Sequence, residues 1–188
     1  MAVLIQKGKL VDPVRNLVGD HDLLIEKGRI ARILPGGAFS DSGPGLRIID
    51  ARNRVVVPGL VDMHVHLREP GYEYKETIAT GSLSGVAGGF TALACMPNTK
   101  PVNDKRAITA LILDRAREAN LCRVYPIGAI TMGQEGEALT DFADLRKAGA
   151  VGVSDDGRPV VRREIMRRAL EFGRSCGLVV ISHCEDLS

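Results

Sequence analysis

Residues 60–71 read LVDMHVHLREPG, an apolar run that carries two histidines two positions apart and stops at Pro70 and Gly71. In an extended strand, side chains at positions i and i+2 point to the same side, so His64 and His66 would face one spot. Two imidazoles arranged in this way can chelate a metal ion. The alternative is that one histidine is a hydrogen-bonded core residue and the other its exposed polar neighbour.

The residues after the histidines favour the metal site. Pro70 and Gly71 end the strand and leave the charged side chains of Arg68 and Glu69 at its carboxyl end. Active sites of α/β barrels lie at the carboxyl ends of the strands. The stretch therefore predicts a barrel strand with a functional site at its end.

The composition narrows the class of protein. The chain has 188 residues, 45% of them hydrophobic, and a net charge of +2 with both signs dispersed, which suits a globular protein of one domain or slightly more. No basic face or polybasic segment stands out, and only 4% of residues are aromatic, so we expect neither a nucleic-acid nor a membrane partner. The chain shows no long apolar span and no signal-peptide pattern, which predicts a cytoplasmic location.

The four cysteines, Cys95, Cys122, Cys176 and Cys184, form no Cys-x-x-Cys pair and lie in or beside apolar runs. In a cytoplasmic protein this pattern is typical of buried free thiols.

Residues 1–58 favour a small antiparallel β-sheet or β-sandwich. Short runs rich in β-branched residues alternate with Gly, Asp and Asn turns at hairpin spacing. The predicted strands cover residues 3–5, 9–11, 23–25, 29–34, 48–49 and 55–57. Between them we expect a surface loop at 38–45 and a polar turn at 19–22, with His21 exposed to solvent. Pro58 and Gly59 mark the predicted domain boundary.

From residue 59 onward, strands alternate with helices. After the strand that carries His64 and His66, the predicted strands cover 90–96, 124–130, 151–153 and 178–181. The predicted helices cover 76–86, 105–119, 141–148 and a segment with apolar residues at 161, 165, 169 and 172. This alternation indicates βαβ units and a parallel sheet. Since a full barrel needs about 250 residues, we predict an α/β fold with a partial (β/α)8 TIM-like barrel of about five of eight strands. The predicted domains are 1–58, a β-sandwich segment, and 59–188, the first part of the barrel.

Polar side chains follow several of these strands. Asn98 follows the second, Asp155 and Asp156 follow the fourth, and His183 follows the fifth. Because parallel strands end at one edge of the sheet, these residues can converge with the first two histidines. Imidazole and carboxylate ligands suit a zinc-like divalent ion that makes hydroxide available near neutral pH. The alternative for the two aspartates is a turn or a helix cap, and chemistry alone does not say which of them is the ligand.

Arg68 lies two positions past His66 and continues the same face. A guanidinium beside a metal site suits bidentate capture of a substrate carboxylate, to which Asn98 could donate a second hydrogen bond. The alternatives are a surface arginine and a turn asparagine.

These residues stand in motifs that resemble the amidohydrolase superfamily and, within it, the class I dihydroorotases. The matching segments are residues 62–71, 74–77, 88–91, 96–99, 154–157 and 183–186. The resemblance extends over the whole chain and implies a distorted (β/α)8 barrel with a small β-sandwich. It also implies a cytoplasmic enzyme of pyrimidine biosynthesis that interconverts dihydroorotate and N-carbamoyl-L-aspartate.

The resemblance also implies a metal centre with one or two zinc ions. His64 and His66 would bind one zinc, Asp156 would bridge or bind metal, and His183 would bind the second zinc.

By the same resemblance, Arg68 and Asn98, together with His66, would bind the substrate. The family places another metal-binding histidine on the sixth strand and the catalytic aspartate on the eighth. Neither falls within these 188 residues, so we expect the general base to lie beyond Ser188. We therefore expect no catalytic residue in this chain and little or no turnover from it alone.

Two rival functions follow from the same pattern. A hydantoinase or allantoinase would share the barrel and the paired histidines, but residues 96–99 and an aspartate rather than a lysine on the fourth strand argue against it. A non-catalytic dihydroorotase-like subunit would act as a structural partner of aspartate transcarbamoylase. The resemblance also allows a homo-oligomer.

Overall fold

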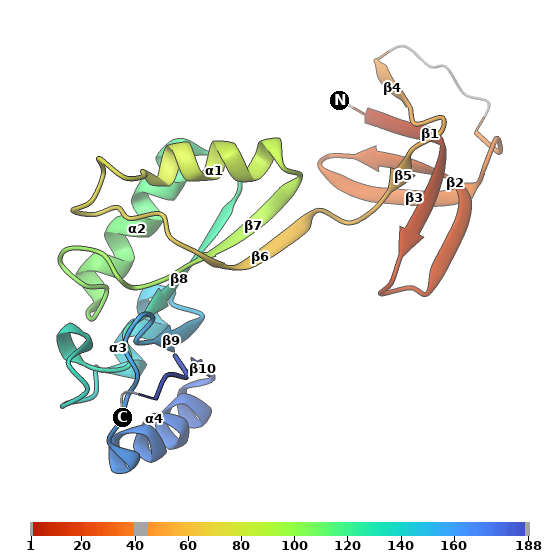
Figure 1. Cartoon of the computed structure of the whole chain (residues 1–188). Coiled ribbons are helices and arrows are strands. Elements are labelled where there is room, and N and C mark those ends of the chain that lie inside the picture. Colours follow the sequence, from red (N-terminus) through yellow and green to blue (C-terminus); the bar gives the residue numbers. More distant parts are fainter. Residues whose placement is uncertain (1, 40–44, 187–188) are drawn as a thin grey trace. The chain divides into compact units, whose positions relative to one another are not determined.

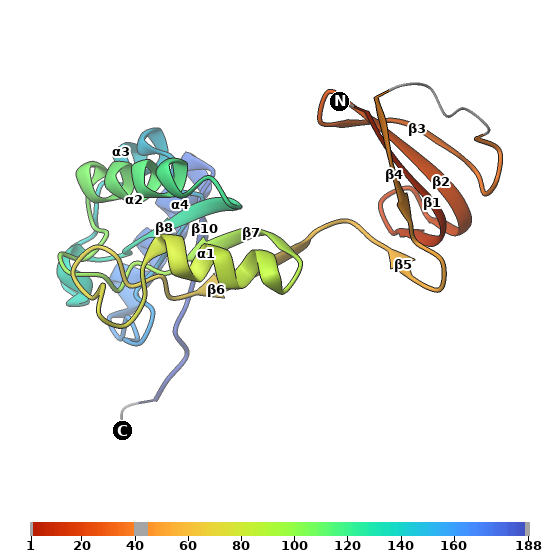
Figure 2. The same cartoon turned by 90° about the horizontal axis from the view of Figure 1, so that it is seen from above.

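The computed structural model describes residues 2–39 and 45–186, and the chain divides into two compact units at Pro58 and Gly59. Unit 1 comprises residues 1–58 and unit 2 residues 59–188. Figures 1 and 2 show a small β-sheet in unit 1 and a mixed α/β arrangement in unit 2. The predicted α/β fold class is confirmed.

Unit 1 is built around one long strand. Its five strands are β1 (Ala2–Asp12), β2 (Leu17–Glu26), β3 (Arg29–Pro35), β4 (Leu46–Asp50) and β5 (Val55–Val56). They pair in the order β3-β2-β1-β4, and β5 also pairs with β1. Buried leucines of β1 and β2, including Leu4, Leu10 and Leu23, form the apolar centre of this sheet.

Three expectations for unit 1 are wrong. The runs at 3–5 and 9–11 form a single strand, interrupted by a bulge at which Lys7 adopts a positive φ of 65°. Strands β4 and β5 lie parallel to β1, so the sheet is mixed rather than antiparallel. His21 lies within β2 and is partly buried, and its Nδ1 atom is buried with no hydrogen-bond partner among the described residues. The predicted loop at 38–45 falls mostly outside the described residues.

Unit 2 alternates strands and helices as predicted. Its elements are β6 (Leu60–Val65), α1 (Ile78–Ala87), β7 (Phe90–Cys95), α2 (Arg106–Ala119), β8 (Arg123–Gly128), a 3-10 turn (Met132–Gln134), α3 (Phe142–Ala148), β9 (Gly152–Ser154), α4 (Arg163–Cys176) and β10 (Val179–Ile181). The strands form a parallel sheet in the order β10-β9-β8-β7-β6, curled like part of a barrel (Figure 1). The predicted partial barrel of five strands is confirmed.

Helices α1 and α3 begin at residues whose side chains satisfy free backbone groups of the first turn. Thr77 and Thr80 form a capping box at the start of α1, and Asp141 accepts a hydrogen bond from the backbone of Asp144 at the start of α3. Gly81 of α1 packs against the side chain of Leu67, the second residue after β6, and an added Cβ would lie 2.4 Å from that side chain. The glycine therefore lets α1 approach the sheet.

Two apolar clusters hold the helices against the sheet. One contains Leu67, Ile78, Leu93, Cys95, Ile108, Ile112 and Val124. The other contains Ile130, Phe142, Leu145, Ala150, Val153, Ala169 and Leu178. Full burial of each large side chain contributes roughly 1.5–3 kcal/mol, so these clusters fix the strand ends that carry the polar residues.

Some apolar residues are more exposed than the sequence pattern suggested. Met63 on β6 is 76% exposed because β6 is an edge strand of the described sheet. Val161 precedes α4 and is 71% exposed, and the buried stripe of α4 continues at Gly173 rather than at Phe172. Among the cysteines, Cys95 is buried, whereas Cys184 is exposed, contrary to expectation.

Across the described residues, no helix is both long and apolar enough to cross a membrane.

Candidate metal centre

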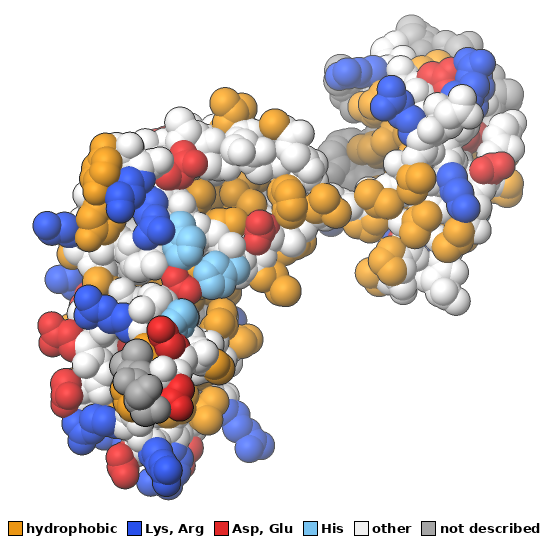
Figure 3. Space-filling model, viewed as in Figure 1, with side chains coloured by type: hydrophobic (Ala, Val, Ile, Leu, Met, Phe, Trp, Pro, Cys, Tyr) orange, Lys and Arg blue, Asp and Glu red, His pale blue; other side chains and the backbone are white. Residues whose placement is uncertain are grey.

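The two histidines of the opening stretch lie together at the end of β6. His64 is in the strand and His66 follows its last residue, and their ring centroids are 5.2 Å apart in an edge-to-face arrangement. The backbone N–H of His64 donates a hydrogen bond to the Asp62 carboxylate at 3.1 Å. Figure 3 shows histidine side chains gathered on one face of unit 2 with an acidic side chain beside them.

Asp156 completes a three-residue group with these histidines. Its Oδ1 lies 3.1 Å from Nε2 of His64 and its Oδ2 lies 3.6 Å from Nε2 of His66. One ligand atom from each residue lies within 4.8 Å of the others. Asp156 follows β9, so the group joins residues from opposite parts of the curled sheet.

The donor set and its spacing fit a zinc ion. Tetrahedral zinc with nitrogen and oxygen ligands at about 2.0–2.1 Å would hold those ligands about 3.3 Å from one another. Nε2 of His64 lies 3.1 Å from Oδ1 of Asp156, and Nε2 of His66 lies 3.6 Å from the other carboxylate oxygen, Oδ2, so each histidine has an Asp156 oxygen near that separation. His64 is about half exposed, with 51% of its side chain accessible, which leaves the group open to an incoming ion.

Asn98 lies between two members of this group. It follows β7, and its Oδ1 lies 2.9 Å from Nδ1 of His66. Its Nδ2 donates a hydrogen bond to Oδ2 of Asp156, also at 2.9 Å. The side-chain amide predicted to hold a substrate carboxylate therefore contacts a histidine and an aspartate of the group.

Asp155 faces a different set of partners. The buried carboxylate accepts hydrogen bonds from the backbone N–H groups of Ile130 and Thr131, at 2.8 and 3.0 Å, and from the Thr131 hydroxyl. Burial raises the pKa of Asp155, although the hydrogen bonds from Thr131 and Ile130 oppose that shift. The structure therefore places Asp156, and not Asp155, beside the histidines.

Arg68 lies in the turn that follows His66. Its backbone adopts a left-handed conformation with φ 61°, uncommon for a residue with a side chain. The turn is fixed on both sides, since the Arg68 carbonyl accepts a hydrogen bond from Tyr72 and Glu69 accepts one from the backbone of Ile78 at 2.9 Å. The guanidinium of Arg68 forms no ion pair with any described residue.

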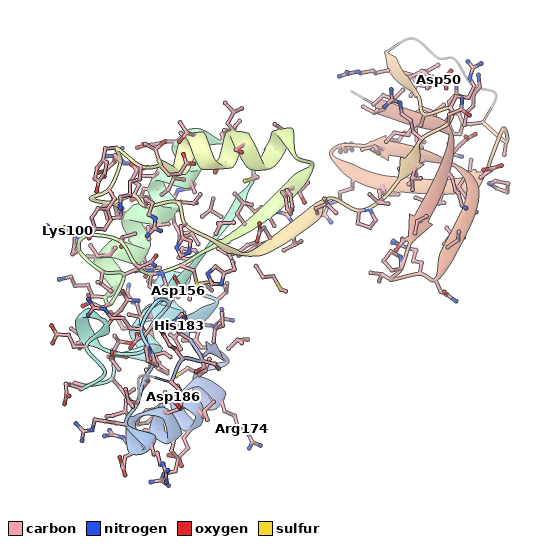
Figure 4. All side chains as sticks on the ribbon, viewed as in Figure 1. Asp50, Lys100, Asp156, Arg174, His183 and Asp186 are labelled. Carbon is pink, nitrogen blue, oxygen red and sulfur yellow. The ribbon has the colours of Figure 1, made fainter. Side chains whose placement is uncertain are left out.

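His183 follows β10, the strand next to β9. Ile181 pairs with Ser154, so His183 and Asp156 each lie two positions past a paired residue. Figure 4 labels both side chains in unit 2. The Nε2 atom of His183 lies 3.0 Å from the Glu185 carboxylate. His183 does not belong to the group of His64, His66 and Asp156, so the structure brings together three of the four predicted metal ligands. The metal role of His183 stays a prediction.

The general base was expected beyond Ser188, the last residue of the sequence. Residues 187 and 188 lie outside the described part of the chain, which ends at Asp186. The place of the general base stays a prediction of the family resemblance.

Sequence reasoning missed two supporting residues. Thr131 holds Asp155, and Glu69 holds the turn after His66 and lies 3.4 Å from Arg115. The contact of Thr131 with Asp155 spans 24 residues and that of Glu69 with Ile78 spans nine, and neither belongs to a pattern with a recognised spacing. The one available signal was the place of Asp155 directly after an apolar strand, which is typical of a buried residue with a structural role.

A family model described as dihydro-orotase-like matches residues 53–188. The chain belongs to this family. The dihydroorotase of Pelobacter propionicus is 54% identical over all 188 residues, and that of Syntrophus aciditrophicus is 50% identical over the same length. The chain spans 44% of each of these two relatives.

Solved structures agree on the fold. The L-hydantoinase of Arthrobacter aurescens superposes with a TM-score of 0.78 at 22% identity, covering 98% of this chain and 41% of that one. A D-hydantoinase gives 0.76, also at 22% identity, covering 98% of this chain and 40% of that one. At this identity the likeness shows a shared fold.

Proposed function

We propose that the protein acts as a dihydroorotase, with zinc-dependent and reversible hydrolysis of dihydroorotate to N-carbamoyl-L-aspartate. The observation that carries the proposal is the group of His64, His66 and Asp156 in a chain about 50% identical, over its whole length, to proteins named dihydroorotase. The reaction breaks the ring amide C–N bond. The oxygen of water goes to the carbonyl carbon and a proton goes to the nitrogen.

Each residue of the site has a proposed role. Nε2 of His64, Nε2 of His66 and the Asp156 carboxylate would hold zinc, which supplies hydroxide near neutral pH when bound. His183 would hold a second zinc. Arg68, with a fixed backbone and no ion-pair partner among the described residues, would bind the substrate carboxylate, with Asn98 and His66 beside it.

The site residues favour this reading over the two rivals. A scaffold without catalytic function would not need two imidazoles and a carboxylate at ligand spacing. Arg68, two positions past His66 and without an ion-pair partner among the described residues, suits a substrate with a carboxylate, which hydantoin lacks. A cytoplasmic location is part of the proposal and is supported by the four free thiols. Association with aspartate transcarbamoylase and self-association remain predictions of the family resemblance.

A chimera tests the function. Residues 1–188 would replace the matching segment of the Pelobacter propionicus dihydroorotase, and the purified chimera would be assayed with zinc on dihydroorotate, hydantoin and allantoin. We expect preference for dihydroorotate and loss of activity in the His64→Ala, His66→Ala variant. A folded, zinc-loaded chimera that prefers hydantoin or allantoin, or hydrolyses none of the three, would contradict the proposal.

The isolated chain gives a second test. We expect its turnover of dihydroorotate with added zinc to fall far below that of the chimera, because none of the residues given a role in the proposed site is the family's catalytic aspartate. Equal turnover by the two proteins would show that this chain supplies its own general base.

A further inference from the structure

Asn98 makes two hydrogen-bond contacts that are chemically different. The Asp156 carboxylate can only accept hydrogen bonds when ionised, so the NH₂ group of Asn98 must face it, as the 2.9 Å contact places it. The amide oxygen is then left for His66, 2.9 Å from its Nδ1. An amide oxygen can only accept, so Nδ1 of His66 must carry a proton.

We propose that Asn98 is a positioning residue that fixes His66 in the Nδ1–H tautomer and orients the Asp156 carboxylate at the same time. A neutral imidazole carries one proton, so Nε2 of His66 is left with its lone pair. Of the two ring nitrogens, this is the one that lies 3.6 Å from Oδ2 of Asp156. The inference rests on the proposed metal centre, since the free lone pair on Nε2 is what a zinc ion would use.

The effect of Asn98 opposes the one expected from the carboxylate alone. With no other partner, His66 would be drawn to protonate Nε2 and donate it to the nearby Asp156. The His66 Nε2 to Asp156 Oδ2 distance is 3.6 Å, beyond normal hydrogen-bond length, whereas Asn98 lies 2.9 Å from the same oxygen. Asn98 therefore takes the place at Oδ2 that an Nε2–H group of His66 would otherwise occupy.

His64 provides an internal comparison. Its Nε2 lies 3.1 Å from Oδ1 of Asp156, within hydrogen-bond reach, and its Nδ1 has no hydrogen-bond partner among residues 2–39 and 45–186. Nothing in this part of the chain fixes its tautomer as Asn98 fixes that of His66. In the metal-free chain we expect His64 to favour Nε2–H, donated to Asp156, and His66 to favour Nδ1–H.

NMR of the metal-free chain with ¹⁵N-labelled histidine tests the inference directly. At pH 8.5, where an ordinary histidine is neutral, long-range proton–nitrogen correlations report which ring nitrogen carries the proton. We expect Nδ1–H for His66 in the wild type and a change to mainly Nε2–H in Asn98→Leu. Asn98→Asp keeps an oxygen acceptor at Nδ1 and should preserve the Nδ1–H form. Met63→Leu, on the exposed side of the same strand, is the control and should leave both histidines unchanged.

Zinc affinity, measured by competition with a chromophoric chelator, gives the second readout. Loss of a partner that orients a metal-binding histidine typically weakens binding about 10–100-fold, and we expect that loss in Asn98→Leu but not in Met63→Leu.

If the wild type binds no zinc, the proposed metal centre is wrong while the tautomer measurement still tests Asn98. If His66 carries its proton on Nε2 in the metal-free wild type, or if Asn98→Leu leaves its tautomer unchanged, the inference is overturned. Should Asn98→Leu fail to fold, the wild type and Asn98→Asp spectra still decide between the two tautomers.

Discussion

Asp155 and Asp156 are consecutive residues, yet the carboxylate of Asp155 binds the backbone of Ile130 and Thr131 while that of Asp156 lies 3.1 Å from Nε2 of His64. One aspartate therefore ties the end of β9 to the loop after β8, and the other is presented at the histidines. The first contact supports the second, because it fixes the backbone from which Asp156 projects.

Replacement of Asp155 should separate its structural role from its charge. Asp155→Ala leaves two buried N–H groups without acceptors, at about 1–3 kcal/mol each, so we expect unit 2 to lose roughly 2–6 kcal/mol of unfolding free energy. Asp155→Asn keeps one oxygen for both N–H groups and should lose much less. Urea unfolding followed by tyrosine fluorescence measures this, since Tyr72, Tyr74 and Tyr125 all lie in unit 2. Equal losses in the two variants would contradict the role given to these hydrogen bonds.

Gly71 holds the turn after His66 against the loop after β7. Its φ is +94°, and an added Cβ would lie 1.9 Å from the carbonyl oxygen of Lys100. Gly71→Ala should therefore destabilise unit 2 by roughly 3 kcal/mol or more, because backbone must move. The matched control is Gly177→Ala, with φ +66° and open space around the position, which should cost only about 1–2 kcal/mol. The same fluorescence titration compares them, and a Gly71→Ala loss no larger than that of the control would refute the close contact.

Zinc binding should depend on the histidine pair. We expect the isolated His64→Ala, His66→Ala variant to bind zinc at least about 100-fold more weakly by isothermal titration calorimetry, since each replacement removes one nitrogen ligand. His21→Ala, in unit 1, is the control for loss of a histidine and should bind as the wild type does. Unchanged affinity in the double variant would place the zinc elsewhere.

The cysteines should differ in reactivity. Burial raises the pKa of the Cys95 thiol to about 12 from an ordinary value of 9.0, while Cys184 is exposed. At pH 8 we expect iodoacetamide to modify Cys184 readily and Cys95 only after unfolding, as read by peptide mass spectrometry.

The same shift sets a direction for stability. Because the pKa of Cys95 is higher in the folded state, its contribution is complete below pH 9 and is lost as the pH rises from 9 toward 12. As the pH rises from 9 toward 12, the unfolding free energy of Cys95→Ala should therefore fall less than that of the wild type. A parallel decline in the two proteins would show that Cys95 does not titrate on unfolding.

Much of unit 2 could be predicted from the sequence because local signals agreed with the fold. The helix predicted at 105–119 forms at Arg106–Ala119, and the one predicted at 141–148 begins after its Asp141 cap. Unit 1 was less predictable. The segments at 46–50 and 55–56 have hairpin spacing, but both pair in parallel with β1, and no local pattern encodes a choice between distant partners.

The site was predictable in outline and not in detail. The i, i+2 spacing of His64 and His66 indicated that the rings would meet. The distinction between Asp155 and Asp156 required the positions of Ile130 and Thr131, which no spacing rule reaches. The bridging contacts of Asn98 depend on the curl of the sheet, which brings β6, β7 and β9 within reach of one amide group.

The ligand atoms of His64 and Asp156 meet although the residues lie about 90 positions apart in the chain. An ion bound between them would act as a removable cross-link that closes a long loop of the polypeptide, and at 100 times its dissociation constant it would add about 2.7 kcal/mol against unfolding. Proteases that cleave unfolded chains would then degrade the ion-free molecules faster than the ion-bound ones. The free concentration of that ion would therefore set what fraction of the molecules resists proteolysis.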